Sequence, residues 1–361
     1  MTRWTPSEDG VVFPLIGSID DYEPHTIEML DDAEARRYWL DVFRTHTAGL
    51  AERAALAAGN DEDAQARAAE FAAAFDAVLD RLESDPFTFG SLDIALLCTL
   101  RQHLLATQGF DDPFLPIKQK ENADALALLP ALLTELDALP EAERLRRLIA
   151  GVFAGNIFDF GASEAIKLYE AGQVDFHVTR EQVAAKQWLV DHLAKLEARF
   201  AEHVHRRAVV FVDNAGADVV LGMIPLARYL LQRGTHVVLT ANSKPALNDV
   251  IHDELEELID QIAAFDAPIA DALADGSLTL APSGNALPVI DLTSVDAQLA
   301  AAAEDADLLV LEGMGRALET NYRHRFTCDT LKLAMIKEQH VADVLGGKLY
   351  DVVCHFDLAP E

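Results

Sequence analysis

In the first 145 or so residues, apolar side chains recur at the three- and four-residue spacing that is typical of helices. The stripe is clearest in Phe71, Phe75, Val78 and Leu82, within a stretch rich in alanine and charged residues. Residues 1 to about 25 are expected to be irregular because prolines interrupt them. Helices are predicted over residues 27–82 with a break at Gly59-Asn60, over 91–107, over about 123–139 with an interruption at Pro130, and from Pro140 onward.

Beyond residue 207 the pattern changes to short apolar runs rich in valine, which alternate with amphipathic stretches. Such runs are too short for helices and fit strands that are buried on both faces. Strands are predicted over 208–212, 235–240, 288–291, 307–311 and 348–353, and helices over about 219–231, 245–265 and 295–303. Because this alternation implies parallel pairing, we predict an α/β fold: a helix-covered, mainly parallel Rossmann-like sheet over residues 149–361, after an all-helical domain over residues 1–148.

Residues 151–162 differ from both halves of the chain. Their sequence, GVFAGNIFDFGA, places three glycines and two alanines around Asn156 and Asp159. Small residues allow the backbone to approach another segment closely, so we interpret this stretch as a tight connection. A helical pattern returns over residues 168–200, with a break near Gly172.

The charge balance narrows the classes of partner. With 29 basic and 60 acidic residues, the formal net charge is −31, which argues against binding to nucleic acid or to an anionic membrane surface. An acidic protein also repels phosphorylated metabolites, so a site for them needs local positive charge from side chains or a metal ion. The first thirty residues lack the apolar core of a signal peptide, and no apolar run has the length of a membrane span. We therefore expect a cytoplasmic protein.

Polar residues follow the predicted strand at 208–212. Asp213 and Asn214 offer two hard oxygen ligands, which suit a divalent ion such as magnesium or manganese. In an open parallel sheet, ligands bind at the carboxyl ends of the strands, where these residues fall. Taken alone, the pattern favours a cap by Asp213 on a helix that starts near Ala217. Asp218 would lie in the first turn of that helix, where a negative charge is favourable in any case.

A second polar stretch, Asn242 to Asp249, follows the predicted strand at 235–240. Asn242 or Ser243 resembles a helix cap, and the free backbone N–H groups of a helix start can bind phosphate oxygens. Asp249 is not on the apolar stripe of the predicted helix, so the pattern leaves it in solvent. It faces the cleft only if the first turn overhangs the edge of the sheet.

A third polar stretch, Glu312-Gly-Met-Gly-Arg316, follows the predicted strand at 307–311. The glycines permit close approach of the backbone, and Arg316 can bind a phosphate or carboxylate with two parallel hydrogen bonds. Gly-x-Gly is also common in ordinary turns. Lys337, on a segment with a helical pattern, fits a solvated helix face. The sequence has neither the Gly-x-Ser-x-Gly elbow of hydrolases nor the Gly-x-x-x-x-Gly-Lys phosphate loop.

Taken together, these motifs resemble the metal-dependent damage-control phosphatases, a family formerly numbered 89 among domains of unknown function. The nearest branch includes the plant stand-alone enzymes and the phosphatase domain fused to a pantothenate-kinase-like domain in animals. The resemblance covers most of residues 90–355 and rests on GFDDPF (109–114), KEN (120–122), GNIFDFGA (155–162), FVDNAGADVVLG (211–222), TANSKPALNDV (240–250), LEGMGRALETNY (311–322) and CDTLKLAMIKEQHVADVLGGKLYDVV (328–353).

The resemblance implies roles for individual residues. Asp213, Asn214 and Asp249 match the metal ligands, for manganese, cobalt, nickel or magnesium, and Lys337 matches a lysine that contacts the phosphate. Matches to the rest of the pocket are Asn156, Asp159, Asn242, Ser243, Glu312, Gly313, Met314 and Arg316. Two positions depart from the family pattern: Phe160 replaces an expected Trp, and Ala215 an expected Ser.

The activity implied is hydrolysis of a small phosphomonoester, either phosphopantetheine or a derivative, or a sugar phosphate, by a metal-activated water. Asp213 or Asp249 would act as general base, and Lys337 would hold phosphate charge. One alternative is a carboxyl methyltransferase that uses S-adenosylmethionine, although the loop after the first strand lacks the Gly-x-Gly that such cofactors favour. Another is a non-catalytic regulator that binds a phosphometabolite.

Overall fold

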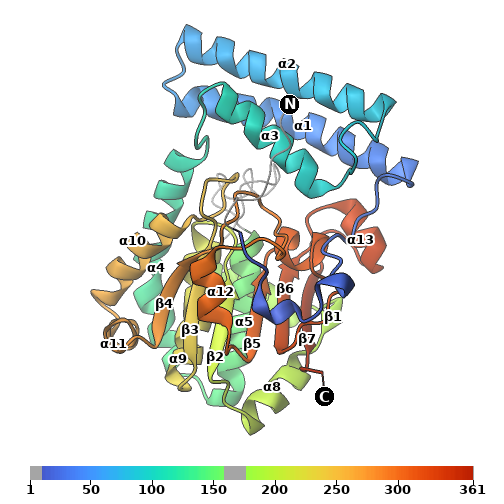
Figure 1. Ribbon diagram of the computed structural model, residues 1–361. Coiled ribbons are helices and arrows are strands. Elements are labelled where there is room, and N and C mark those ends of the chain that lie inside the picture. The colour runs from blue at the N-terminus through green and yellow to red at the C-terminus, as the bar shows by residue number, and fades with distance from the viewer. Residues whose placement is uncertain (1–9, 158–175, 361) are drawn as a thin grey trace.

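The computed structural model describes residues 10–157 and 176–360 of the chain. Figure 1 shows a layer of helices above an α/β part in which a sheet is flanked by further helices. The sheet is mostly parallel, and the predicted fold class is confirmed. Among the described residues, no helix has the length and apolar character that a membrane crossing requires.

Three N-terminal helices form the upper layer. They are α1 (Ala33–Ala57), α2 (Glu62–Ser84) and α3 (Ile94–Thr107). Each begins at an aspartate whose side chain accepts hydrogen bonds from first-turn N–H groups: Asp32, Asp61 and Asp93. The predicted break at Gly59-Asn60 separates α1 from α2, and Phe71 and Phe75 of the predicted stripe are fully buried. Two short 3-10 helices, η1 (Pro14–Ile16) and η2 (Ile19–Asp21), precede this layer.

Two long helices lead from this layer to the sheet. They are α4 (Leu115–Asp137), which continues through Pro130 without the predicted interruption, and α5 (Glu141–Ile157). Residues 151–157 are therefore helix, and the prediction of a tight connection is wrong for them. The expected close approach does occur: a Cβ on Gly155 would lie 2.7 Å from the carbonyl oxygen of Ala217. The predicted domain boundary at residue 148 falls within α5, and the division into two domains stays a prediction.

The described residues form a sheet of seven strands in the order β1-β7-β6-β5-β2-β3-β4, and every neighbouring pair is parallel except β6 and β7. The strands are β1 (Val190–Asp191), β2 (Arg207–Phe211), β3 (His236–Ala241), β4 (Leu278–Pro282), β5 (Leu308–Glu312), β6 (Asp329–Met335) and β7 (Val352–Asp357). The predicted strand at 288–291 does not form, and the last strand starts at Val352 instead of residue 348.

The sequence pattern missed β4, β6 and the very short β1. In β6 the reason is that charged side chains are buried and are paired with groups outside the strand. The Lys332 ammonium donates to the carbonyl oxygens of Tyr322 and His324 at 2.9 and 2.8 Å. Asp329 accepts from Arg199 at 2.6 Å, and its Oδ2 lies 2.8 Å from Nε2 of His205. Polar residues with such partners can occupy a central strand. They interrupt the apolar run by which a buried strand is recognised in the sequence.

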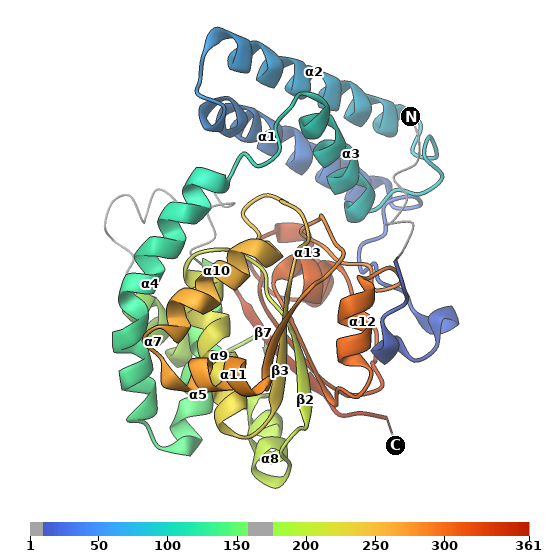
Figure 2. The same cartoon turned by 60° about the vertical axis from the view of Figure 1, so that its left-hand side comes forward.

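Helices cover both faces of the sheet, as Figure 2 shows. Alternate residues of β2 point to opposite sides: Val209 and Phe211 join a core with the N-terminal helices, whereas Ala208 and Val210 join a core with α4 and α5. The remaining elements are α7 (Phe176–Ala185), α8 (Leu193–Glu202), the π-helix η3 (Asp218–Met223), α9 (Ile224–Gln232), α10 (His252–Ala263), α11 (Ala267–Asp275), α12 (Ala297–Ala303), the π-helix η4 (Gly315–Glu319) and α13 (Gln339–Leu345).

The order of strands marks where a ligand site belongs. From β2 the chain proceeds outward through β3 to β4, and then returns to place β5 on the other side of β2. The crossovers therefore leave β2 and β5 in opposite directions, and a crevice opens at their carboxyl ends. The residues that follow β2 and β5 are those that the sequence predicted as a site.

Candidate metal and phosphate site

The loop after β2 carries a hydrogen-bonded group of acidic and amide side chains. The Asn214 amide donates to Oδ2 of Asp213 at 3.0 Å and to Oδ2 of Asp218 at 2.8 Å. All three side chains are buried. The π-helix that follows, η3, has no side-chain cap, so the interpretation of Asp213 as a helix cap is wrong.

Asp249 points into the same crevice, not into solvent. The predicted helix from residue 245 begins only at His252, so residues 242–251 form a loop. This loop pairs with the loop after β2: the N–H of Val250 donates to the carbonyl oxygen of Asp213 at 2.9 Å, and Asn214 and Asp249 form an antiparallel bridge. Only 2% of Asp249 is exposed. This short backbone pairing buries Asp249 in the crevice, an orientation that the helical pattern could not predict.

The later helix start also changes the expected roles of Asn242 and Ser243. Neither caps a helix, so the interpretation of this position as a helix start is wrong, and phosphate binding by Asn242 and Ser243 stays a prediction. The Asn242 amide is buried and donates to Oδ2 of Asp249 at 3.0 Å. Ser243 is exposed, and its hydroxyl accepts from the N–H of Gly284 at 2.8 Å.

The segment after β5 brings a cation between the acidic loops. The guanidinium of Arg316, which is 1% exposed, bonds to Oδ1 of Asp213 through Nη1. Its Nη2 donates to Oδ2 of Asp249 at 2.7 Å and to Oδ1 of Asn242 at 3.1 Å. The planar fork of arginine suits two acceptors at once. Arg316 therefore joins the loops that follow β2 and β3.

Glycines allow this crowded arrangement. Gly313 has φ +96°, and a Cβ there would lie 2.2 Å from Oδ2 of Asp213. A Cβ on Gly315 would lie 2.1 Å from the carbonyl oxygen of Pro288. Both positions of this motif require glycine because other atoms lie close to the backbone there, as the sequence predicted.

Helix α5 contributes Asn156, which is fully buried. Its amide donates at 2.9 Å both to Oδ2 of Asp218 and to Oε1 of Glu312. Asn156 therefore bridges the loop after β2 and the end of β5. Asp159, which the resemblance placed over the site, lies outside the described residues.

Lys337 follows β6 directly and does not lie on a helix, so the interpretation as a solvated helix face is wrong. Its backbone N–H lies 3.2 Å from Sδ of Met314. Its ammonium lowers the pKa of Asp218 and of Glu312 in opposition to their burial. The structure therefore brings Lys337 to the carboxylates.

Three carboxylates form the centre of the site. Asp213, Asp218 and Glu312 each offer one ligand atom, and these atoms lie within 4.8 Å of one another. Burial and the neighbouring negative charges raise the pKa of Asp218 to about 7 and raise that of Glu312 well above its ordinary value. Within residues 10–157 and 176–360, Oδ1 of Asp218 and Oε2 of Glu312 are buried oxygens without a hydrogen-bond partner. Hard oxygen donors with excess negative charge fit a divalent cation.

Sequence reasoning missed Asp218. A negative charge is favourable at a helix start, so the position of Asp218 was explained without a role in the site. The signal that could have identified it is the wholly apolar run that follows, Val219-Val-Leu-Gly-Met. Such a helix is buried all round, so a carboxylate at its start is buried too. Of the predicted metal ligands, Asp213 belongs to the carboxylate centre, Asn214 bonds to it, and Asp249 is joined to it through Arg316.

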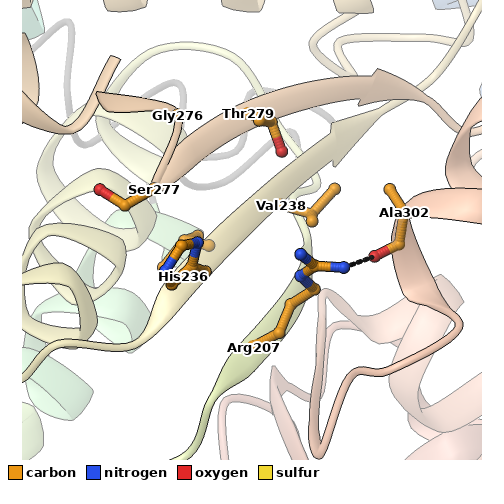
Figure 3. A pocket seen from close by; sticks show the side chains of 8 residues that line it. Arg207, His236, Val238, Gly276, Ser277, Thr279 and Ala302 are labelled. Atoms are coloured by element: carbon orange, nitrogen blue, oxygen red, sulfur yellow. Dashed lines mark hydrogen bonds between the residues drawn. The ribbon is translucent and has the colours of Figure 1, made fainter. Parts of the chain in front are cut away.

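A separate pocket lies at the opposite end of the strands (Figure 3). It is lined by Arg207, His236, Val237, Val238, Gly276, Ser277, Thr279 and Ala302. Arg207 donates to the carbonyl oxygen of Ala302 at 3.3 Å and pairs with Asp305 at 3.5 Å. Because these residues, apart from Ala302 on α12, lie at or just before the starts of β2, β3 and β4, the pocket is not part of the site at the carboxyl ends.

Comparison with known proteins confirms the resemblance. Residues 42–353 match the family described as the damage-control phosphatase ARMT1-like domain. An Arabidopsis thaliana protein named a damage-control phosphatase is 40% identical over 88% of this chain and 87% of its own length. The Arabidopsis protein named pantothenate kinase 2 is 43% identical over 96% of this chain but only 42% of its own length. The Mus musculus protein named 4'-phosphopantetheine phosphatase is 34% identical over 96% of this chain and 48% of its own length.

The chain thus spans less than half the length of these last two relatives. Among solved structures, a DUF89-family protein from Pyrococcus horikoshii superposes with a TM-score of 0.60 at 16% identity. The superposition covers 87% of this chain and 96% of that protein. At this identity the similarity establishes a shared fold.

Proposed function

Because the chain belongs to the damage-control phosphatase ARMT1-like domain family, we propose that it hydrolyses a small phosphomonoester metabolite with the help of a divalent metal ion. The observation that carries the proposal is the meeting of three buried carboxylates with Arg316 and Lys337 at the carboxyl ends of β2, β5 and β6. A site of this kind supplies ligands for a cation and positive groups for a phosphate in one place.

The carboxylate centre fits a divalent ion by its chemistry. Asp213 with Asn214 and Asp249 would hold the ion, as the family resemblance implies, and Asp218 and Glu312 are close enough to complete or support the ligand set. Carboxylate and carboxamide oxygens suit magnesium, manganese, cobalt or nickel. When bound, such an ion supplies electrophilic charge that stabilises a phosphoryl group under attack by water.

The protein's own cations would hold the phosphate. Lys337 lies on the side of the centre formed by Asp218 and Glu312, and Arg316 lies between Asp213 and Asp249. These groups meet the requirement, set by the net charge of −31, for local positive charge around a phosphorylated ligand. Asp213 or Asp249 would act as general base, since both carboxylates face the crevice from the loops beside it.

The substrate class follows from the relatives and belongs to the same proposal. The relative named 4'-phosphopantetheine phosphatase favours phosphopantetheine or a derivative, and a small sugar phosphate is the second candidate. A methyltransferase would instead need a pocket for S-adenosylmethionine at the end of β2. The described residues place Asp213, Asn214 and Arg316 there, in close mutual contact.

The test is hydrolysis of p-nitrophenyl phosphate, followed by a panel of phosphometabolites, with manganese, cobalt, nickel and magnesium in turn. Asp213→Ala and Asp249→Ala are expected to lose metal-dependent hydrolysis and keep the circular dichroism spectrum of the wild type. Asp260→Ala, which removes an exposed carboxylate on α10, is the matched control and should keep full activity. Full activity in both site variants would overturn the proposal, as would stabilisation of the wild type by S-adenosylmethionine alone.

A further inference from the structure

A buried lysine of the helical region lies beneath the loop that carries Asp249. Lys118, in the first turn of α4, has no solvent exposure, and its ammonium lies 3.4 Å from the backbone carbonyl oxygen of Asp249. We propose that Lys118 is a positioning residue of the metal site, which fixes the backbone of Asp249 so that its carboxylate faces Arg316 and Asp213. This inference rests on the proposed function, because it assigns Lys118 a role in that same site.

Lys118 forms two ion pairs and one hydrogen bond. Its Nζ lies 2.8 Å from Oδ2 of Asp112 and 2.7 Å from Oε1 of Glu254, in addition to the Asp249 carbonyl oxygen. A buried ammonium is costly unless its charge is paired, and the two carboxylates supply that pairing. Asp112 precedes α4, whereas Asp249 and Glu254 lie on residues 249–254, so the lysine holds these two segments together.

Glu254 contacts the loop at a second point. Its other oxygen, Oε2, accepts from the backbone N–H of Ile251 at 3.1 Å. The ion pair between Lys118 and Glu254 therefore fixes this backbone at two points, the carbonyl oxygen of Asp249 and the N–H of Ile251. Because the Asp249 side chain projects from this short segment, a shift of the backbone moves its carboxylate away from Nη2 of Arg316.

The same helix also holds the other acidic loop. Oδ1 of Asn122 accepts from the N–H of Gly216 at 2.6 Å. Gly216 has φ +76°, and a Cβ there would lie 2.8 Å from Cβ of Glu121. Lys118 and Asn122 are four residues apart and so lie on one face of the helix. The start of α4 thus contacts both loops that carry predicted metal ligands, although these loops lie far apart in the sequence.

A purely structural role would also explain why a buried lysine is paired, so the experiment must separate folding from positioning. In Lys118→Met, the carboxylates of Asp112 and Glu254 lose their cation, and the variant is expected to be less stable. The double variant Lys118→Met/Glu254→Gln removes one of these charges and keeps an acceptor for Ile251. It restores much of the stability but not the contact with Asp249.

The readout is manganese affinity, measured by calorimetric titration, together with kcat and KM for p-nitrophenyl phosphate. We expect about tenfold weaker manganese binding and about tenfold lower kcat/KM in the folded double variant, whereas Lys118→Arg recovers part of both. Lys186→Met is the matched control: Lys186 is a partly exposed lysine that pairs with Asp351 at 2.9 Å, and its loss should change neither quantity.

Wild-type manganese affinity and kcat/KM in the folded double variant would overturn the positioning role and leave the phosphatase proposal intact. A wild-type protein that neither binds manganese nor hydrolyses any phosphomonoester would overturn both. Asp249→Asn is expected to weaken manganese binding. If adding Lys118→Met/Glu254→Gln to this variant causes no further weakening, Lys118 acts through Asp249. Independent, additive effects of the two changes would contradict that route.

Discussion

Gly313 lies so close to Asp213 that a Cβ on the glycine would be 2.2 Å from Oδ2 of the aspartate. No side chain fits at that distance, and the positive φ of +96° adds strain for any other residue. The end of β5 can therefore lie against the predicted metal ligand only because residue 313 has no side chain. The position of Asp213 thus depends on a residue that carries no chemistry itself.

Gly313→Ala is accordingly expected to displace Asp213 and to lower kcat by roughly 100-fold, since small misplacements of reacting groups have effects of that size. Gly234→Ala is the matched control. Gly234 also has a positive φ, of +87°, but no atom of the part of the chain that the structure describes lies within 4 Å of its Cβ position. Steady-state kinetics with manganese would measure both variants. Equal losses in the two would attribute the effect to backbone strain and contradict the contact with Asp213.

A second prediction concerns the stability of the protein with and without metal. Because Asp213, Asp218 and Glu312 crowd negative charge in a buried place, Glu312→Gln is expected to raise the melting temperature of the EDTA-treated protein by ~2 °C or more. The stabilisation that manganese gives the wild type, about 2.7 kcal/mol at a concentration of 100 times Kd, should shrink in this variant. Thermal unfolding in EDTA and in manganese measures both effects.

The other acidic group among the described residues provides the control for this measurement. His252, Asp253 and Glu256 also bring ligand atoms together, but they are largely exposed. Glu256→Gln should leave the manganese shift unchanged. A manganese shift that persists in Glu312→Gln and disappears in Glu256→Gln would place the metal on α10 and contradict the assignment.

A third prediction concerns the contact between α1 and the segment after Lys337. The hydroxyl of Tyr38 donates to Oε2 of Glu338 at 2.9 Å and accepts from the N–H of Gln339 at 3.1 Å. Tyr38→Phe removes both bonds, so the segment that carries Lys337 gains freedom. We expect a KM several-fold higher for p-nitrophenyl phosphate with little change in melting temperature. Tyr350→Phe, at an exposed tyrosine, should behave as wild type, and an unchanged KM in Tyr38→Phe would disprove the role of this contact.

A fourth prediction concerns acid stability, away from the site. Burial acts to raise the pKa of Asp329, but hydrogen bonds from His205, the N–H of Ala359 and Arg199 outweigh it and lower the pKa to about 2. The folded-state pKa is thus below the unfolded value of about 3.9. The ionised carboxylate therefore stabilises the fold above about pH 4, and this contribution is lost as the pH falls toward 2.

Asp329→Asn should accordingly be less stable than the wild type at pH 7, and the difference should narrow toward pH 3. Urea unfolding over this pH range provides the measurement. Asp260→Asn, at an exposed position, should match the wild type throughout. A stability difference that is constant from pH 7 to pH 3 would show that the ionised carboxylate does not carry the effect.

The sequence predicted the parts of the site that follow strands with clear apolar runs. Asp213 lies two residues after β2, and Glu312 is the last residue of β5. Apart from Arg207 and Glu312 at their ends, both strands consist of buried apolar residues that need no polar partner. The helices of the first half were equally evident, because their stripes and caps are local. These features depend on neighbours in sequence, and a pattern can reveal them.

What the pattern could not predict depends on partners that are distant in sequence. Asp249 is buried because its loop pairs with the loop after β2. Strand β6 was missed because Lys332 and Asp329 are satisfied by remote carbonyl, histidine and arginine groups. Lys118 resembles any charged residue on a helix until Asp112 and Glu254 are seen around it. For Asp249, family resemblance supplied the orientation that periodicity lacked.

The most direct test of a phosphatase site at the carboxyl edge of the sheet measures release of inorganic phosphate from 4'-phosphopantetheine. The protein is first dialysed against EDTA, and the release is measured before and after manganese is added back. The wild type is expected to release phosphate only when manganese is present, and Asp213→Asn is expected to release none under either condition. Release by the wild type without any divalent ion, or undiminished release by Asp213→Asn, would contradict a metal-dependent phosphatase centred on Asp213.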